Sequence, residues 1–354
     1  MDDTRRAFLE ALLSVPGPSG FEARGQRVWI NHVEAYADEV QVDDYGNAVA
    51  TYHGDDGPSV ALAGHGDQIG LIVRRIEEKG FLRVGRIGGT DRTVTQGRRV
   101  VAHGDDGPVP GVVGQTAIHL RDTDTEGSVD VDEQYVDIGA TDGDEARELV
   151  SVGDPVTVAS EGVVDLAGNR LTAAGLDNRV GVWSAAEGLR RAAAAEVDAT
   201  VHAVSTVQEE VGLQGARMVG EEMDLDAVVA IDVTHAGDHP GLDTGQRTPI
   251  DLGGGPVVVR GSANHPVLVD EARAAADDDG IAVQLQASGS RTGTDADAFY
   301  VASGGTPTLS IGIPNRYMHT PAEVVDAEDL TDTARLMGSL VGRLAARDSF
   351  TVDV

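Results

Sequence analysis

The hydrophobic pattern of the N-terminal segment predicts two helices separated by a turn. Apolar side chains recur at helical spacing in 4–13, and a Pro-Gly-Pro sequence directly afterwards ends this helix. Ser19 and Glu22 form an S-x-x-E pattern, which is typical of a capping box at a helix start. We therefore expect a second helix that begins there and runs towards Val40.

Short apolar runs predict strands in the next part of the chain. Two strands are expected within 40–52, around a turn at Tyr45-Gly46-Asn47, and the run 59–64 fits a buried strand. From about 71 to 160, short β-rich runs alternate with Gly and Asp turns, and only 144–150 has helical periodicity. This texture predicts a small β-barrel or sandwich inserted into another domain.

After residue 173 the pattern alternates between helices and strands, which indicates an α/β sheet covered by helices. The predicted helices are 178–195, 212–220, 266–280, 295–303 and 329–347, and the predicted strands are 199–207, 227–233, 281–286 and 308–313. We expect 1–70 and 161–354 to form one discontinuous α/β domain, and 71–160 to form an inserted β-rich domain.

Acidic or histidine side chains stand just beyond five apolar segments. These residues are His65 with Asp67, Asp177, Glu209 with Glu210, Asp232, and His319. In an open α/β sheet, ligands bind outside the carboxyl ends of the strands, so these groups are expected to converge. Imidazole and carboxylate oxygens are the usual ligands of catalytic zinc and related ions. Each residue alone is more often a cap, turn or core residue, and only their joint order indicates a site for two divalent metal ions.

Composition narrows the function classes. The chain has 27 basic and 59 acidic residues, a formal charge of −32, and no Cys. The charge argues against nucleic-acid and membrane partners, and the lack of Cys excludes disulfides, Cys-ligated metal centres and thiol nucleophiles. No apolar run is long enough to span a membrane and no secretory signal is visible, so we expect a soluble cytoplasmic protein.

The kind of charge adds a second expectation. Lys79 is the only lysine, and aromatic residues make up 4% of the chain. Acidic, lysine-poor surfaces suit concentrated salt, which screens charge repulsion within a few Å. We interpret the charge as adaptation of a halophilic protein to a salty cytoplasm; a cation-storage or acidic interaction surface is the alternative.

Several motifs in order resemble the tetrahedral (TET) aminopeptidases, a family of dinuclear metallopeptidases that includes glutamyl, leucyl and lysyl aminopeptidases. The stretches that carry the resemblance are PGPSGFE, GHGDQIGLIV, GPVPGVVG, YVDIGA, GLDNRVG, TVQEEVGLQGA, AIDVTHAGDHP, GTDADAF and IPNRYMHTPAEVV. They span nearly the whole chain. The resemblance implies an α/β, mixed-sheet metallopeptidase domain with an inserted small β-barrel domain. It also implies hydrolysis of N-terminal residues from peptides, and a homododecamer built from dimers through the inserted domain.

The resemblance also assigns roles to the residues above. It places one metal on His65 and Asp232 and the other on Glu210 and His319, with Asp177 bridging both. Glu209 is implied to be the general base that takes a proton from a metal-bridging water. Asp67 is implied to accept a hydrogen bond from His65. The two ions per subunit would be Zn or Co, with Mn as an alternative. Relatives often have a cis peptide after the bridging Asp, here Asp177–Asn178.

Other positions keep two interpretations. Gly66 and Gln68 depart from the residues that many relatives carry, which puts the local shape near the first metal in doubt. His202 is expected in a sheet, and His235 and His239 in a loop, with His235 a candidate to support the metal ligands. The stretch 293–299 either lines the substrate cleft or caps a helix.

Two further functions stay open at this point. The same two-metal site would serve a deacylase or deacetylase of amino-acid derivatives, because the sequence does not fix the substrate pocket. A non-enzymatic protein with a structural metal is less consistent with a complete ligand set plus Glu209. Paired carboxylates also suggest a glucanase, but a glycosidase needs no His ligands.

Overall fold

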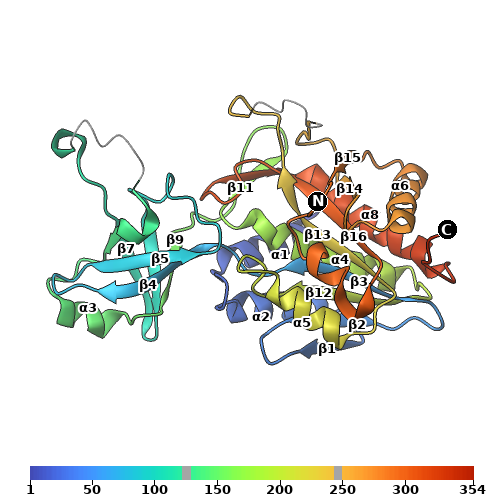
Figure 1. Cartoon of the computed structure of the whole chain (residues 1–354), viewed down its shortest axis with the longest axis horizontal. Coiled ribbons are helices and arrows are strands. Elements are labelled where there is room, and N and C mark those ends of the chain that lie inside the picture. The colour runs from blue at the N-terminus through green and yellow to red at the C-terminus, as the bar shows by residue number, and fades with distance from the viewer. Residues whose placement is uncertain (122–128, 243–248) are drawn as a thin grey trace. The chain divides into compact units, whose positions relative to one another are not determined.

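The computed structural model describes residues 1–121, 129–242 and 249–354, and their contacts divide the chain into two compact units. The first unit comprises Met1–Asp67, Gly162–Met318 and Ala322–Val354. The second comprises Gln68–Glu161 and the short segment His319–Pro321. Figure 1 shows the chain and labels many of its helices and strands. The predicted domain boundaries, and the predicted role of the insertion in oligomerisation, stay predictions.

An eight-stranded mixed sheet forms the centre of the first unit. In spatial order its strands are β1 (Glu39–Val42), β2 (Ala48–Tyr52), β12 (Thr200–Thr206), β3 (Ser59–His65), β13 (Ala227–His235), β16 (Thr308–Asn315), β14 (Val257–Arg260) and β15 (Gln284–Ala287). The four central strands β12, β3, β13 and β16 are parallel, so their carboxyl ends lie at one edge. The predicted mixed-sheet α/β fold is confirmed.

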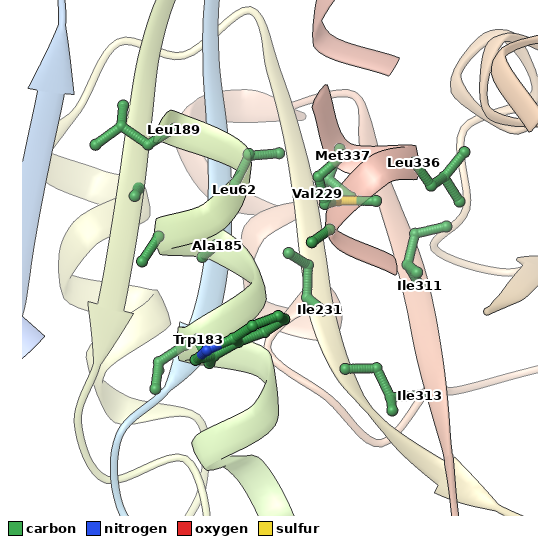
Figure 2. Close-up of a cluster of buried hydrophobic side chains, with 14 of the residues drawn as sticks. Leu62, Trp183, Ala185, Leu189, Val229, Ile231, Ile311, Ile313, Leu336 and Met337 are labelled. Atoms are coloured by element: carbon green, nitrogen blue, oxygen red, sulfur yellow. The ribbon is translucent and has the colours of Figure 1, made fainter. Parts of the chain in front are cut away.

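Helices cover both faces of this sheet. They are α1 (Asp3–Ser14), α2 (Ala23–Val33), α4 (Leu176–Ala194), α5 (Gln214–Glu222), α6 (Pro266–Asp279), α7 (Ala296–Phe299) and α8 (Ala327–Ala345). Figure 2 shows part of the larger core, to which Trp183 and Leu189 of α4, Ile231 of the sheet and Met337 of α8 contribute buried side chains. Helices α5 and α7 pack on the opposite face, in a separate cluster that includes Phe299.

A three-stranded antiparallel sheet also belongs to the first unit. It consists of β10 (Val164–Asp165), β11 (Arg170–Ala173) and β17 (Glu323–Asp326). Strand β11 leads directly into α4 and so to Asp177. The sequence pattern groups Asp177 with residues at the strand ends of the main sheet, but the strand before it belongs to this smaller sheet. The pairing of β11 with β17 reaches across more than 140 residues of sequence, so no local pattern predicts it.

The second unit is a closed antiparallel barrel with the strand order β4-β5-β8-β7-β6-β9. The strands are β4 (Gly70–Ile76), β5 (Leu82–Ile87), β6 (Arg99–Gly104), β7 (Gly107–Val113), β8 (Tyr135–Asp137) and β9 (Pro155–Val158). Helix α3 (Gly143–Leu149) lies between β8 and β9 in the chain. The core of the barrel is small and aliphatic, with Leu82, Val84 and Val136 fully buried. The β-barrel expected for the insertion is confirmed.

Two local predictions near α2 are wrong. Ser19 and Glu22 form no capping box: Glu22 is the N-cap residue, but its side chain makes no hydrogen bond to the helix start. The helix also ends at Val33 rather than near Val40. It ends because the chain is recruited into the sheet, where the Asp38 N–H donates to the Thr51 carbonyl at 2.8 Å. Among the described residues, no helix combines the length and apolar character that crossing a membrane requires.

Candidate metal centre

His65 lies at the carboxyl end of β3 and is 2% exposed. Its Nε2 atom is 3.3 Å from Asp177 Oδ1, 3.6 Å from Asp232 Oδ1 and 3.9 Å from Glu209 Oε2. Two ligand atoms that each lie ~2.1 Å from a tetrahedral zinc ion are about 3.4 Å apart. The distances from His65 Nε2 to the Asp177 and Asp232 oxygens therefore fit the spacing between ligands of one divalent ion.

Asp177 and Asp232 reach this position from different elements. Asp232 lies inside β13, three residues before the end of that strand, rather than beyond it. Asp177 lies in the first turn of α4, where its N–H donates to Glu323 Oε2 at 2.8 Å and the Asp177–Asn178 peptide is cis. The Asn178 side chain donates to the Ile231 carbonyl at 2.8 Å, which ties the start of α4 to the residue before Asp232.

Glu209 and Glu210 follow β12 after a left-handed residue, Gln208, whose φ is 58°. Asp67, which is fully buried, accepts hydrogen bonds from both of their backbone N–H groups, at 3.0 Å on Oδ1 and 3.2 Å on Oδ2. Asp67 Oδ1 also lies 3.3 Å from His65 Nδ1. The direction of this contact does not satisfy hydrogen-bond geometry, so it is an electrostatic contact between the two side chains.

His319 follows β16 by four residues and is grouped by its contacts with the second unit. Its Nδ1 atom is 3.2 Å from the Gly89 carbonyl oxygen. A carbonyl can only accept a hydrogen bond, so Nδ1 carries the proton and the lone pair is on Nε2. A Cβ atom at position 89 would lie 2.6 Å from the same Nδ1, so only glycine permits this approach.

The buried carboxylates of the first unit repel one another strongly. Burial raises the pKa of Glu209 to about 10, and the Asp232, Asp295 and Glu210 carboxylates add to this, against the opposing effect of His65. Burial alone would lower the pKa of His65, but Glu209 and Asp232 raise it well above its usual range. Burial likewise raises the pKa of Asp295 to about 7.

This charge distribution fits a bound cation. His65, Glu209 and Asp232 are all buried and offer ligand atoms within 4.8 Å of one another. A buried cluster with one imidazole and several carboxylates is unfavourable unless the carboxylates are protonated or a cation neutralises them. The ligand types, imidazole and carboxylate without thiolate, are those of hydrolytic zinc, cobalt and manganese sites. The residues present therefore fit a divalent metal.

A cavity of about 490 Å³ opens beside Asp232. Val233 and Thr234 of β13 line it, together with Gln286, Arg291 and Thr294. Thr234 lies on the same face of β13 as Asp232, because side chains two apart in a strand share a face. None of the described lining residues is Asp or Glu, although 59 of the 354 residues in the chain are acidic. The cavity is thus locally less negative than the protein as a whole.

Two neighbouring polar residues were not expected to support the site. Ser19 donates to Asp67 Oδ2 at 2.6 Å, and Thr206 donates to the buried Asp295 Oδ2 at 2.6 Å. Both lie in motifs that the sequence already singles out, but a local capping pattern hides the long-range role of Ser19. In 293–299, Thr294 lines the cavity, while Asp297 accepts from the Thr292 and Gly293 N–H groups.

The other histidines lie outside this cluster. His202 lies in β12 between the Thr51 and Ser59 hydroxyls, at 2.9 and 3.1 Å, in the sheet position expected for it. His235 ends β13 and lines the cavity. His239 lies in the following loop, edge-on to the Tyr317 ring. Gly66 leaves no room for a side chain, because a Cβ atom there would lie 2.8 Å from Ser205 Oγ.

Comparison with known proteins places this geometry in a family. Residues 46–336 match the family model described as M42 glutamyl aminopeptidase. A lysyl aminopeptidase of Pyrococcus furiosus is 34% identical over 96% of this chain and 98% of its own length. The crystal structure of a TET aminopeptidase from the marine sediment archaeon Thaumarchaeota archaeon SCGC AB-539-E09 is 32% identical, covers 97% of both chains and superposes with a TM-score of 0.91.

A third relative bears on assembly. It is the Pyrococcus horikoshii TET1 peptidase, described as able to assemble into a tetrahedron or a large octahedral shell. It is 28% identical, covers 95% of this chain and 98% of its own, and has a TM-score of 0.85. The family match, the relatives and the shared fold agree over nearly the whole chain. The chain therefore belongs to the M42 glutamyl aminopeptidase family, and it is a metal-dependent aminopeptidase.

Proposed function

We propose that the chain removes N-terminal residues from peptides with two divalent metal ions per subunit. His65 and Asp232 would hold one ion, Glu210 and His319 would hold the other, and Asp177 would serve as a ligand of both. The distances from His65 Nε2 to Asp177 and Asp232 support the first set. Chain connectivity supports the second set of ligands, because His319 directly follows Met318, which belongs to the first unit. We expect zinc or cobalt, with manganese as an alternative. When bound, such ions polarise a scissile carbonyl and lower the pKa of water.

Glu209 is proposed as the general base, with Asp67 as its support. A buried carboxylate beside the candidate metal ligands can take up a proton from water and later donate it to the leaving amine. Its side chain lies farther from His65 Nε2 than those of Asp177 and Asp232 do, which suits a base beside the metal rather than a ligand. Asp67 fixes the backbone on which Glu209 and Glu210 stand.

The cavity beside Asp232 is proposed to receive the side chain of the substrate's N-terminal residue. It adjoins the metal-ligand candidate Asp232 because Thr234, which lines the cavity, lies on the same face of β13. Its polar lining includes Gln286, whose Oε1 accepts from Thr234 at 2.8 Å, so that its NH₂ group is left to donate. With Arg291, this lining favours acidic and neutral side chains over basic ones.

The Glu209→Gln variant tests the proposed mechanism, with the exposed Glu221→Gln as a matched control. Calorimetric titration with zinc or cobalt is expected to show two ions bound per subunit in both variants. Turnover of aminoacyl-anilides is expected to fall by about 10²–10⁴-fold only in Glu209→Gln. Retained turnover would refute the general-base role, and a single bound ion in the unmodified protein would refute the two-metal set. Acetylated amino acids in the same assay test the deacylase alternative, which no observation favours.

We further propose that the subunits self-associate into a dodecamer built from dimers and work in the cytoplasm on short peptides. The assembly described for the horikoshii TET1 peptidase supports the first part. Light scattering in molar salt measures the mass directly. A mass near one chain, 36.8 kDa, would contradict the dodecamer.

A further inference from the structure

The loop between α1 and α2 directs two buried polar side chains away from its own helix. Ser19 and Glu22 are only 8% and 4% exposed. The Ser19 hydroxyl donates to Asp67 Oδ2 at 2.6 Å. Glu22 Oε1 accepts from the N–H of Gly20 at 2.7 Å and from that of Gln208 at 3.2 Å. Both side chains therefore contact groups around the turn that follows β12.

The carbonyl groups of 207–209 accept from the backbone N–H groups of 212–215, but the N–H groups of this turn are held by side chains from elsewhere. Four successive backbone N–H groups, those of residues 207–210, donate to carboxylate or amide oxygens rather than to other backbone groups. The acceptors in order are Asn47 Oδ1 at 2.9 Å, Glu22 Oε1 at 3.2 Å, Asp67 Oδ1 at 3.0 Å and Asp67 Oδ2 at 3.2 Å. The sheet ladder ends at Thr206. Side-chain acceptors thus replace the missing ladder.

The turn needs this support because Gln208 has a left-handed backbone, with φ of 58°. A residue with a Cβ atom rarely adopts this conformation unless its surroundings fix it. The conformation matters because it separates the directions of the next two side chains, and Glu209 and Glu210 have different proposed partners. Glu22, which accepts from the Gln208 N–H, is therefore placed where it fixes the orientation of the Glu209 side chain.

A buried cation accompanies the two carboxylates. The Arg179 side chain is fully enclosed, and a Cβ atom at Gly17 would lie 2.8 Å from its Nη2. A Cβ atom at Gly25 would lie 3.4 Å from its Nη1. Arg179 attracts both Asp67 and Glu22 electrostatically, so it offsets the cost of burying their charges. Gly17, within the Pro-Gly-Pro sequence, and Gly25 thus make room for the guanidinium.

We propose that Ser19 and Glu22 are positioning residues for Glu209, acting through Asp67 and through the backbone of Gln208. The inference rests on the proposed role of Glu209 as general base. It assigns the PGPSGFE motif to the reaction rather than to the start of α2. Neither residue touches the substrate, so their loss lowers the turnover number while metal binding and KM stay close to normal.

Glu22→Ala, Glu22→Gln and Ser19→Ala test this, with the exposed Glu34→Ala at the other end of α2 as a matched control. We expect Glu22→Ala to lower kcat about 10–100-fold, as for residues that support catalytic groups. KM for the same anilide and the two-ion calorimetric stoichiometry should be unchanged. Glu22→Gln keeps an oxygen acceptor for the Gln208 N–H and is expected to stay within about threefold of the unmodified enzyme.

Ser19→Ala removes a single atom and keeps the inference testable if Glu22→Ala fails to fold. We expect it to lower kcat about tenfold with KM unchanged. Normal kcat in both folded alanine variants would overturn the positioning role, as would an equal loss in folded Glu22→Gln and Glu22→Ala. Normal turnover in Glu209→Gln would instead overturn the proposed base. If the Ser19 and Glu22 variants keep normal kcat while Glu209→Gln is inactive, only the positioning role is overturned and the proposed function stands. The two failures are therefore distinguishable.

Discussion

At the scale of single residues, Asp67 shows how one buried carboxylate organises a site. It accepts from the Ser19 hydroxyl and from the N–H groups of Glu209 and Glu210, and it lies beside His65. Although burial raises its pKa, these donors and His65 together lower the pKa of Asp67 below its usual value. An ionised Asp67 therefore persists at neutral pH and keeps accepting from all of them.

Arg291 is the residue with which we expect substrate preference to change. Within the part of the chain that the structure describes, it is the only Arg or Lys that lines the cavity beside Asp232. Arg291→Glu should favour a lysyl over a glutamyl N-terminus by about tenfold or more in the ratio of kcat/KM, or ~1.4 kcal/mol. Kinetics with glutamyl-, leucyl- and lysyl-anilides measure the change. An unaltered ratio with normal leucyl turnover would place the side-chain pocket elsewhere.

The residue types of the site were predictable, but the supporting contacts were not. His65, Asp177, Glu209 and Asp232 occur in order after apolar segments, and the structure brings their side chains together. Ser19 was misread because S-x-x-E is a local pattern, whereas its actual partner, Asp67, is 48 positions away. Tertiary packing decides whether the Ser19 hydroxyl caps the nearby helix or donates to a distant buried carboxylate. The spacing of residues in the sequence does not carry this information.

At the scale of elements, the close packing of α4 on β3 sets the geometry of the candidate metal ligands His65 and Asp177. A Cβ atom at Gly64 would lie 2.7 Å from the Gly181 carbonyl carbon and from the Val182 backbone nitrogen. Gly64 immediately precedes His65, and α4 carries Asp177. The approach of these two backbones thus holds His65 Nε2 and Asp177 Oδ1 3.3 Å apart.

Gly64→Ala is therefore expected to impair both stability and metal binding. The added methyl group meets backbone rather than a flexible side chain, so α4 must shift, at a cost of about 1–3 kcal/mol in unfolding free energy. Denaturant unfolding and zinc calorimetry measure the two effects. Gly342→Ala in α8, where a Cβ atom meets nothing within 4 Å, is the control. It should raise stability by about 0.5–1 kcal/mol. Wild-type zinc affinity in Gly64→Ala would contradict this account.

His202 links β2, β12 and β3 and predicts a pH dependence of stability. Burial lowers its pKa to about 4, below the ordinary value of 6.5. The folded state therefore resists protonation, and the stability present above the unfolded pKa is lost as the pH falls from about 6.5 towards 4. We expect His202→Gln to remove about 1–2 kcal/mol of the decrease in unfolding free energy between pH 7 and pH 5. Parallel pH profiles for the two proteins would contradict the assignment.

The strands and long helices were largely predictable because their periodicity is local. The alternation after residue 173 and the apolar run 59–64 correspond to β12, β3, β13 and β16. Strands β14 and β17, each four residues long, were missed. Their identity depends on pairing with β16 and β11, which are distant in the sequence. Short strands of this kind can be predicted only when the strands with which they pair are known.

At the scale of the whole molecule, the acidic residues fall into a buried and an exposed group. A small group of carboxylates is buried around the candidate metal centre, where Asp67, Asp177 and Asp232 are each less than 8% exposed. Most of the others lie on the surface, as the exposed pairs Asp55-Asp56 and Asp105-Asp106 do. Such surface charges stay ionised at neutral pH and repel one another over a Debye length.

This separation predicts that salt stabilises the protein independently of its metals. The folded chain has a formal charge of −32, so its surface charges repel one another. This repulsion is strong in dilute buffer, where the Debye length is ~30 Å at 0.01 M, and weak in 1 M salt, where the Debye length is ~3 Å. The unfolding midpoint, followed by circular dichroism with saturating zinc, should therefore rise between dilute buffer and molar KCl. Changing Asp55, Asp56, Asp105 and Asp106 to Asn brings the charge to −32 + 4 = −28 and should lower the salt needed for half-maximal stability. A salt response that vanishes once zinc is saturating would trace the effect to the metal site, and a midpoint independent of KCl would remove the halophilic interpretation of the surface.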